Sequence, residues 1–90
     1  MFGDEIRDII LRSVYGLAKG QSGVAVKVSS VALGAGLEDD EVRHGAEILM
    51  REGLTIPAHE AGCIVLSKAG VAAAKAELEH RSDFVFADGQ

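Results

Sequence analysis

The residues best suited to chemistry lie in two short segments of the chain. His59, Glu60 and Cys63 are close together, and His44 and Glu47 are three residues apart, a spacing that places two side chains on the same side of a helix. A structural zinc site needs four ligands in a tetrahedral set, whereas the chain has one cysteine and therefore no Cys-x-x-Cys pair. We therefore expect no metal site, with His59 in a loop and Cys63 as a small apolar residue of a strand.

Catalytic motifs are equally sparse. A nucleophilic cysteine needs an adjacent base and a group that orients this base, and the sequence does not place a histidine directly beside Cys63. The stretch Gly34-Ala35-Gly36 is not followed by the spacing of a dinucleotide-binding loop, and the sequence has no phosphate-binding loop motif. We therefore expect a protein that is not an enzyme and that uses no cofactor.

Charge is distributed most unevenly over residues 38–52, where the pattern predicts a helix. Val42, Ala46 and Leu49 form its apolar stripe, and Gly45 allows another element to pack closely. Acidic side chains outnumber basic ones by six to two in this segment (Glu38, Asp39, Asp40, Glu41, Glu47 and Glu52 against Arg43 and Arg51). The four acids at its start suit the positive end of the helix dipole and can cap the helix. The same acids oppose the approach of DNA phosphates.

The composition is that of one small globular domain. The chain has 90 residues, of which 48% are hydrophobic and 4% aromatic, so its core must be aliphatic. Its formal net charge of −5 opposes non-specific binding to nucleic acids. The single cysteine excludes an intramolecular disulfide, the first residues lack the pattern of a signal peptide, and no apolar run is long enough to span a bilayer. We therefore expect a cytoplasmic protein without a membrane partner.

The periodicity of apolar residues predicts an alternation of helices and short strands. The predicted elements are a helix over 4–18, a strand over 24–28, a short helix from Ser29 or Ser30 to Ala35, a helix over 38–52, strands over 54–58 and 63–66, and a helix over 68–81. Asp4 and Ser67 are expected to cap the first and last helices, and Gly36 and Gly53 to end the two helices between them. The order predicts an α+β domain over residues 1–81, followed by a C-terminal tail over residues 82–90.

Three segments resemble the winged helix-turn-helix domain of small prokaryotic transcription regulators. Residues 31–37 (VALGAGL) match the second helix of that family and its glycine turn. Residues 41–54 match the third helix and its exit into the wing, and residues 66–70 (LSKAG) match the strand end, hydroxyl cap and glycine that follow the wing. The resemblance implies a three-helix core, a small antiparallel sheet with a wing, and a C-terminal helix. It also implies that the third helix lies in the major groove of DNA.

The DNA-binding surface implied by the resemblance consists of exposed side chains of the third helix and the residue at the base of the wing. The candidate DNA-binding residues are Arg43, His44, Glu47, Arg51 and Lys68. The wing tip carries His59 and Glu60 but no arginine or lysine, although a wing that grips the minor groove normally uses these residue types. Basic residues are therefore sparse where the resemblance requires them.

Apolar side chains in excess of a minimal core form a second candidate surface. Leu11 and Tyr15 make a second apolar strip on the first helix, and Phe84 and Phe86 make the predicted tail apolar. Either these side chains cover one another within a single chain, or they form an interface with another subunit or partner.

Two hypotheses for function follow. The first is a DNA-associated transcription regulator that binds double-stranded DNA as a homodimer, since a domain of this size is marginally stable alone. The alternative is a protein-interaction winged helix that does not bind DNA. Such a module would contact a basic protein partner through Asp39 and Asp40 at the start of the third helix, or through the apolar strips.

Overall fold

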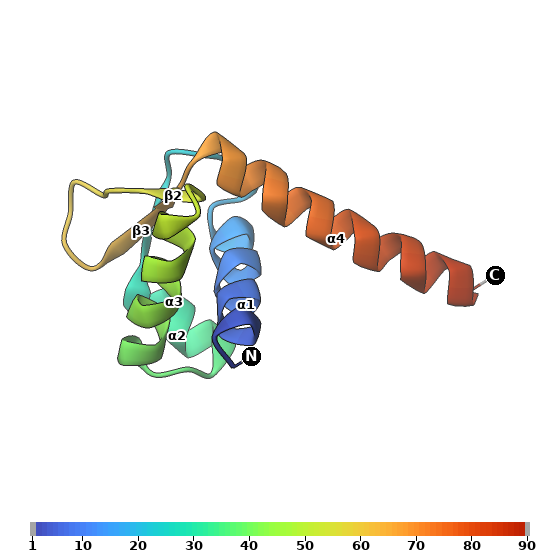
Figure 1. The fold of residues 1–90 in the computed structure, drawn as a ribbon, viewed down its shortest axis with the longest axis horizontal. Coiled ribbons are helices and arrows are strands. Elements are labelled where there is room, and N and C mark those ends of the chain that lie inside the picture. Colours follow the sequence, from blue (N-terminus) through green and yellow to red (C-terminus); the bar gives the residue numbers. More distant parts are fainter. Residues whose placement is uncertain (1, 90) are drawn as a thin grey trace.

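Four helices and a three-stranded antiparallel sheet make up the fold (Figure 1). The structure is a computed structural model that describes the backbone of residues 2–89 and the side chains of residues 5–79. In chain order the elements are α1 (Phe2–Leu17), β1 (Ala25–Lys27), α2 (Val28–Ala35), α3 (Asp39–Arg51), β2 (Thr55–Ile56), β3 (Cys63–Leu66) and α4 (Lys68–Gly89). The predicted α+β class is confirmed, and the arrangement is compatible with a winged helix.

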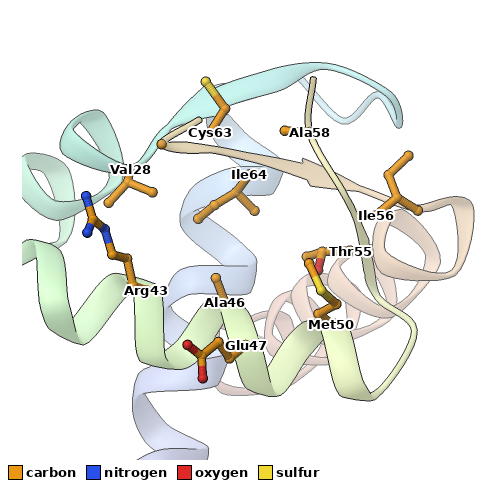
Figure 2. A pocket seen from close by; sticks show the side chains of 11 residues that line it. Val28, Arg43, Ala46, Glu47, Met50, Thr55, Ile56, Ala58, Cys63 and Ile64 are labelled. Atoms are coloured by element: carbon orange, nitrogen blue, oxygen red, sulfur yellow. The ribbon is translucent and has the colours of Figure 1, made fainter. Parts of the chain in front are cut away.

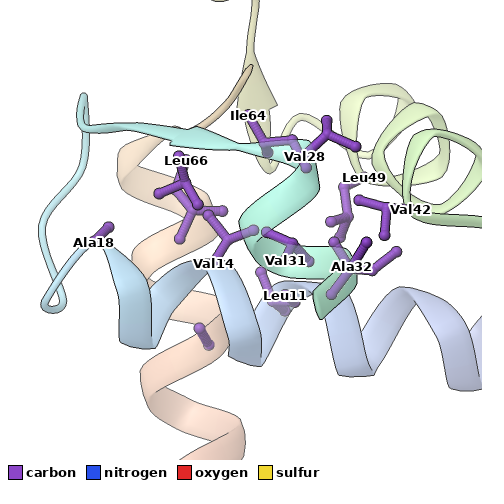
Figure 3. Close-up of a cluster of buried hydrophobic side chains, with 13 residues drawn as sticks. Leu11, Val14, Ala18, Val28, Val31, Ala32, Val42, Leu49, Ile64 and Leu66 are labelled. Atoms are coloured by element: carbon purple, nitrogen blue, oxygen red, sulfur yellow. The ribbon is translucent and has the colours of Figure 1, made fainter. Parts of the chain in front are cut away.

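The core lies between the first three helices and the inner face of the sheet (Figure 3). Its largest fully buried side chains come from α1, α2, α3 and β3 (Ile10, Leu11, Val14, Val31, Val42, Leu49 and Leu66). Smaller buried residues complete it (Ala18, Val26, Val28, Ala32, Ile64 and Ala74). All of these residues are aliphatic, so the prediction of an aliphatic core is confirmed.

Helices α1 and α3 approach each other closely at Gly45. A Cβ atom added to Gly45 would overlap the side chain of Ile10 and would lie 3.2 Å from Cγ2 of Ile6. The predicted role of Gly45 in close packing is therefore confirmed. The start of α1 differs from the prediction, because the helix begins at Phe2 rather than at Asp4.

Strand β3 is the centre of the sheet, with β1 on one side and β2 on the other. Val26 of β1 is paired with Ile64 of β3, and both side chains are buried in the core. On β2 the ladder stops after Ile56, because Pro57 follows at once and has no N–H to donate. The predicted strand over 54–58 is therefore shortened to two residues.

The junction between β1 and α2 corrects the predicted boundary. β1 ends at Lys27, and α2 begins at Val28, whose N–H donates a hydrogen bond of 2.8 Å to the carbonyl of Gly62. The prediction that Ser29 or Ser30 caps this helix is wrong, since the N-cap residue is Lys27 and no side chain caps it. The backbone of the neighbouring hairpin bonds the first amide of the helix, so no hydroxyl is needed there.

The end of α2 agrees with the prediction. Gly36 ends α2 in the left-handed conformation, with φ of 71°, and its N–H donates to the carbonyl of Ala32. Leu37 also donates its N–H to that carbonyl, at 2.9 Å, and its half-buried side chain packs against the core.

Helix α4 begins at the predicted cap and ends later than predicted. The hydroxyl of Ser67 accepts a hydrogen bond from the N–H of Gly70 at 3.0 Å and donates one to the carbonyl of Gly53 at 2.8 Å. The prediction that the helix ends near Arg81 is wrong, because α4 runs to Gly89. Residues 71–88 contain no glycine or proline that would stop it. Its distal half leads away from the rest of the domain (Figure 1).

Candidate interaction surface

Helix α3 has a buried side and an exposed side. Val42, Gly45 and Leu49 are buried at helical spacing against α1 and the core. We call the opposite side, which faces solvent, the outer face of α3; it consists of Asp39, Asp40, Arg43, His44, Glu47, Met50 and Arg51. Four of the predicted DNA-binding residues (Arg43, His44, Glu47 and Arg51) therefore lie together on one exposed surface.

Two of the four acids at the start of α3 cap the helix. The side chain of Glu38 accepts a hydrogen bond from the N–H of Glu41, and Oε1 of Glu41 accepts one from the N–H of Glu38 at 3.0 Å. This reciprocal pair is a capping box, and it satisfies amides that the helix leaves unpaired. The predicted capping role of the acidic run is confirmed for these two residues. Asp39 and Asp40 remain exposed in the first turn.

Each basic side chain on the outer face has an acid one turn before it in the sequence. Asp39 precedes Arg43 by four residues, Asp40 precedes His44, and Glu47 precedes Arg51. Acid before base at this spacing is the favourable orientation on a helix surface. Among residues 5–79 the structure forms no ion pair within any of these couples. The nearby acids nevertheless lower the positive potential that the two arginines present to an approaching phosphate.

Arginines of α1 are engaged in ion pairs within the domain. Arg7 bonds to Asp8 and to Glu52 at the end of α3, and Arg12 bonds to Glu77 of α4 at 2.7 Å. The hydrogen bond that Arg7 donates to the carboxylate of Glu52 raises the pKa of the Arg7 guanidinium, and partial burial opposes this rise. These arginines tie α1 to its neighbours.

Lysines are dispersed over the described surface. Lys68, the remaining predicted DNA-binding residue, is exposed at the first position of α4 rather than on α3. Lys19, Lys27 and Lys75 are exposed at the end of α1, on β1 and on α4. The loop over residues 57–62, which joins β2 to β3, has neither lysine nor arginine. The cations thus come from different elements and are absent from the hairpin loop.

A groove of about 290 Å³ separates α3 from the β2–β3 hairpin (Figure 2). We call it the α3–hairpin groove. Its lining comes from α3, the hairpin and the first residue of α2 (Arg43, Ala46, Glu47, Met50, Thr55, Ile56, Ala58, Gly62, Cys63, Ile64 and Val28). Figure 2 shows Arg43 near Val28 at one end and Met50 near Thr55 and Ile56 at the other. Most of the lining is apolar.

Large apolar side chains are exposed at positions where the sequence pattern did not predict exposure. Met50 is 50% exposed and Ile56 is 44% exposed, and both line the α3–hairpin groove. Leu33 on α2 and Leu17 on α1 are exposed away from this groove. Met50 shares a helix face with Arg43 at i, i+7 spacing, which was the one local signal that it lies on the outer face.

The predicted apolar interface is largely internal. Leu11 is only 1% exposed and belongs to the core, and Tyr15 is half-buried and packs against it. Neither residue therefore offers a broad apolar surface to a partner. Phe84 and Phe86 lie outside the residues whose side chains the structure describes.

The residues with metal-binding side chains, His59, Glu60 and Cys63, do not form a ligand cluster. Within the described part of the chain, no three histidine, cysteine or acidic side chains are grouped so that they could hold a metal ion. His59 and Glu60 are exposed in the hairpin loop, whereas Cys63 is half-buried in the α3–hairpin groove. Over the same described residues, every helix is too short or too polar to cross a membrane.

Comparisons with known proteins provide no relative for this chain. No protein-family model, no curated protein and no solved structure shows significant similarity to it. The function of the outer face of α3 and of the α3–hairpin groove must therefore be inferred from their geometry and charge.

Proposed function

We propose that this domain is a winged helix that acts as a protein-interaction module. In this proposal the outer face of α3 and the β2–β3 hairpin bind a positively charged protein. The observation that carries the proposal is the apolar α3–hairpin groove, with Met50 and Ile56 half-exposed beside it. Exposed apolar surface beside charged residues is typical of protein interfaces, in which methionine is enriched.

The order of the elements supports the winged-helix assignment. A helix, a strand and two helices precede a hairpin that lies beside the third helix, and a last helix follows (Figure 1). In winged helices the third helix and the wing form the usual binding surface. The α3–hairpin groove lies between these two elements.

The charges on this surface favour a basic partner over a nucleic acid. DNA binding depends on lysine and arginine side chains that neutralise phosphates. Here the outer face of α3 has Asp39, Asp40 and Glu47 beside its two arginines, and the hairpin loop has Glu60 without any lysine or arginine.

Charge reversal on α3 tests the proposal. A tagged domain is expressed in its own host, and its partners are identified by mass spectrometry. Asp39→Lys combined with Asp40→Lys should reduce recovery of a basic partner at least about tenfold, since like charges then face each other. The matched control is Glu5→Lys combined with Glu79→Lys, because both of these acids are exposed and lie outside α3 and the hairpin. Thermal melts of both variants check folding.

An unchanged complex after the reversal at Asp39 and Asp40 would remove the outer face of α3 from consideration. Equal loss in the control variant would assign the effect to net charge alone rather than to this surface.

A second candidate function is DNA-associated transcription regulation by a homodimer. It is favoured by the exposure of Arg43, His44 and Arg51 together on α3, where none of them is ion-paired within residues 5–79. A second protomer would have to add the basic surface that residues 5–79 of a single chain lack. Binding of the untagged protein to mixed duplex DNA at low salt, compared with Arg43→Ala, tests this function. The absence of binding at low salt would reject it.

A further inference from the structure

The α3–hairpin groove has the size of a side-chain pocket. Sites for drug-sized ligands and cofactors occupy roughly 300–1,000 Å³, and this groove lies just below that range, at about 290 Å³. Arg43 and Glu47 are the only charged residues that line it among those whose side chains the structure describes. A groove of this size and polarity suits one large apolar side chain better than a phosphorylated or multiply charged small molecule.

The walls of the groove leave apolar surface in water. Met50 on α3 and Ile56 on β2 are each about half exposed, and the shorter side chains of Ala46 and Ala58 leave space between the two walls. Covering such surface is favourable in proportion to the apolar area removed from water. An apolar side chain placed between Met50 and Ile56 would cover both.

The acids exposed on α3 and the hairpin, the two elements that form the groove, are complementary to a basic segment; of these acids, Glu47 lines the groove itself, which Arg43 also lines. Asp39, Asp40 and Glu47 on the outer face of α3 and Glu60 in the hairpin loop are exposed, and none is ion-paired within the described side chains. They outnumber the two arginines of the outer face. Complementary charge of this kind speeds association and selects among partners.

We infer that the α3–hairpin groove binds one large apolar side chain carried by a short, positively charged segment of another protein. This inference rests on the proposed function and adds the position and chemistry of the anchor. The flanking lysine or arginine residues of that segment meet the acids of α3 and the hairpin loop, while the anchor lies between Met50 and Ile56.

Exposed apolar surface elsewhere on the domain provides a control. Leu33 is 87% exposed on α2, and a second depression, of about 270 Å³, is lined by Leu17 of α1 and Gly34 of α2. Leu33 does not line the α3–hairpin groove. A probe that binds any exposed apolar side chain would therefore affect Leu33 as well.

The test uses three synthetic peptides and the full chain. The first peptide is a serine and lysine sequence with one central phenylalanine, the second has alanine in place of the phenylalanine, and the third has glutamate in place of every lysine. Methyl NMR spectra record the shifts of Met50, Ile56 and Ile64 during titration, with Leu33 as the reference. The phenylalanine–lysine peptide should produce saturable shifts at the three groove residues, with a Kd at least about tenfold lower than that of either other peptide.

Variants on the two walls of the groove sharpen the test. Ile56→Gln and Met50→Gln replace half-exposed apolar side chains without adding charge, and each should weaken binding of the phenylalanine–lysine peptide about fivefold or more. Leu33→Gln is the matched control and should leave the Kd unchanged. Thermal melts establish that each variant is folded. Because the two variants lie on different walls of the groove, the test remains valid if one of them unfolds.

The results distinguish failure of the inferred apolar anchor from failure of the proposed function. Equal affinities of the phenylalanine and alanine peptides, with loss of binding in Asp39→Lys/Asp40→Lys, would overturn the anchor and leave the proposed function standing. Absence of saturable shifts at Met50, Ile56 and Ile64, or equal shifts at Leu33, would also overturn the inference. The proposed function fails by a different observation, namely a cellular complex that is insensitive to the reversal at Asp39 and Asp40.

Discussion

The two sides of α3 are built on different physical requirements. On the inner side, Val42 and Leu49 are fully buried, and Gly45 leaves no room for a Cβ atom beside Ile10. On the outer side, Glu47 and Met50 border a groove that no part of the described chain fills. The inner side is constrained by volume and holds the helix in place. The outer side is free of that constraint, so its charges and exposed apolar atoms are available for binding.

Truncation of Leu49 on the inner side of α3 and of Met50 on its outer side should produce the largest difference in stability. Leu49→Ala removes a fully buried side chain and should lower the free energy of unfolding by about 2–5 kcal/mol, because it leaves a cavity in the core. Met50→Ala removes a half-exposed side chain and should change it by less than about 1 kcal/mol. Urea denaturation followed by circular dichroism measures both. Similar losses in the two variants would contradict the distinction between the sides.

Adding one methyl group to a glycine tests the close approach of α1 and α3. Gly45→Ala forces Ile10 to move within a packed core, a penalty of about 1–3 kcal/mol that the better helix propensity of alanine offsets by about 1 kcal/mol. We expect net destabilisation of up to about 2 kcal/mol.

The matched control for this change is Gly34→Ala in α2. Nothing lies within 4 Å of a Cβ atom at Gly34, so alanine there should stabilise the domain by about 0.5–1 kcal/mol. Thermal unfolding of the two variants compares them directly. Stabilisation by Gly45→Ala would show that the inner side tolerates more volume than its packing indicates.

Removal of one hydroxyl tests how the hairpin and α4 are joined to the end of α3. Ser67 caps α4 and also bonds to the carbonyl of Gly53, so Ser67→Ala should lower the free energy of unfolding by about 1–2 kcal/mol. Ser29→Ala is the control, because Ser29 is exposed and caps no helix, and it should stay within about 0.5 kcal/mol of the parent. Hydrogen exchange at the amide of Gly70 should increase in Ser67→Ala alone.

The smallest expected effect is at the ion pair beside the inner side of α3. Arg7→Met breaks the contact with Glu52, but both side chains are partly exposed and screened by solvent. The loss should therefore be at most about 1 kcal/mol and should shrink as salt is added. Arg51→Met, which removes an arginine that is not ion-paired within residues 5–79, serves as the control. A salt-independent loss would indicate that Arg7 acts through packing rather than charge.

Local sequence patterns were sufficient for the helix that carries the candidate site. The period of Val42, Ala46 and Leu49 predicted α3 to within one residue at each end, and the acids at its start predicted the cap that Glu38 and Glu41 form. Ser67 and Gly36 likewise predicted a helix start and a helix end. These features depend on neighbours within one helical turn, and for that reason they can be inferred from sequence alone.

Only the tertiary structure shows which apolar side chains are buried. The sequence left open whether Leu11 is covered within the chain or forms an interface; in the structure it is buried in the core, whereas Leu33 on α2 is exposed to solvent. Ile56 and Met50 line the same groove only because the hairpin folds back along α3. The period of the apolar residues was thus enough to predict where the helices lie, and the i, i+4 spacing was enough to predict that acids and bases alternate on the outer face of α3. The packing of distant segments decided which apolar residues stay exposed, because burial depends on what lies opposite a side chain and not on its own neighbours in sequence.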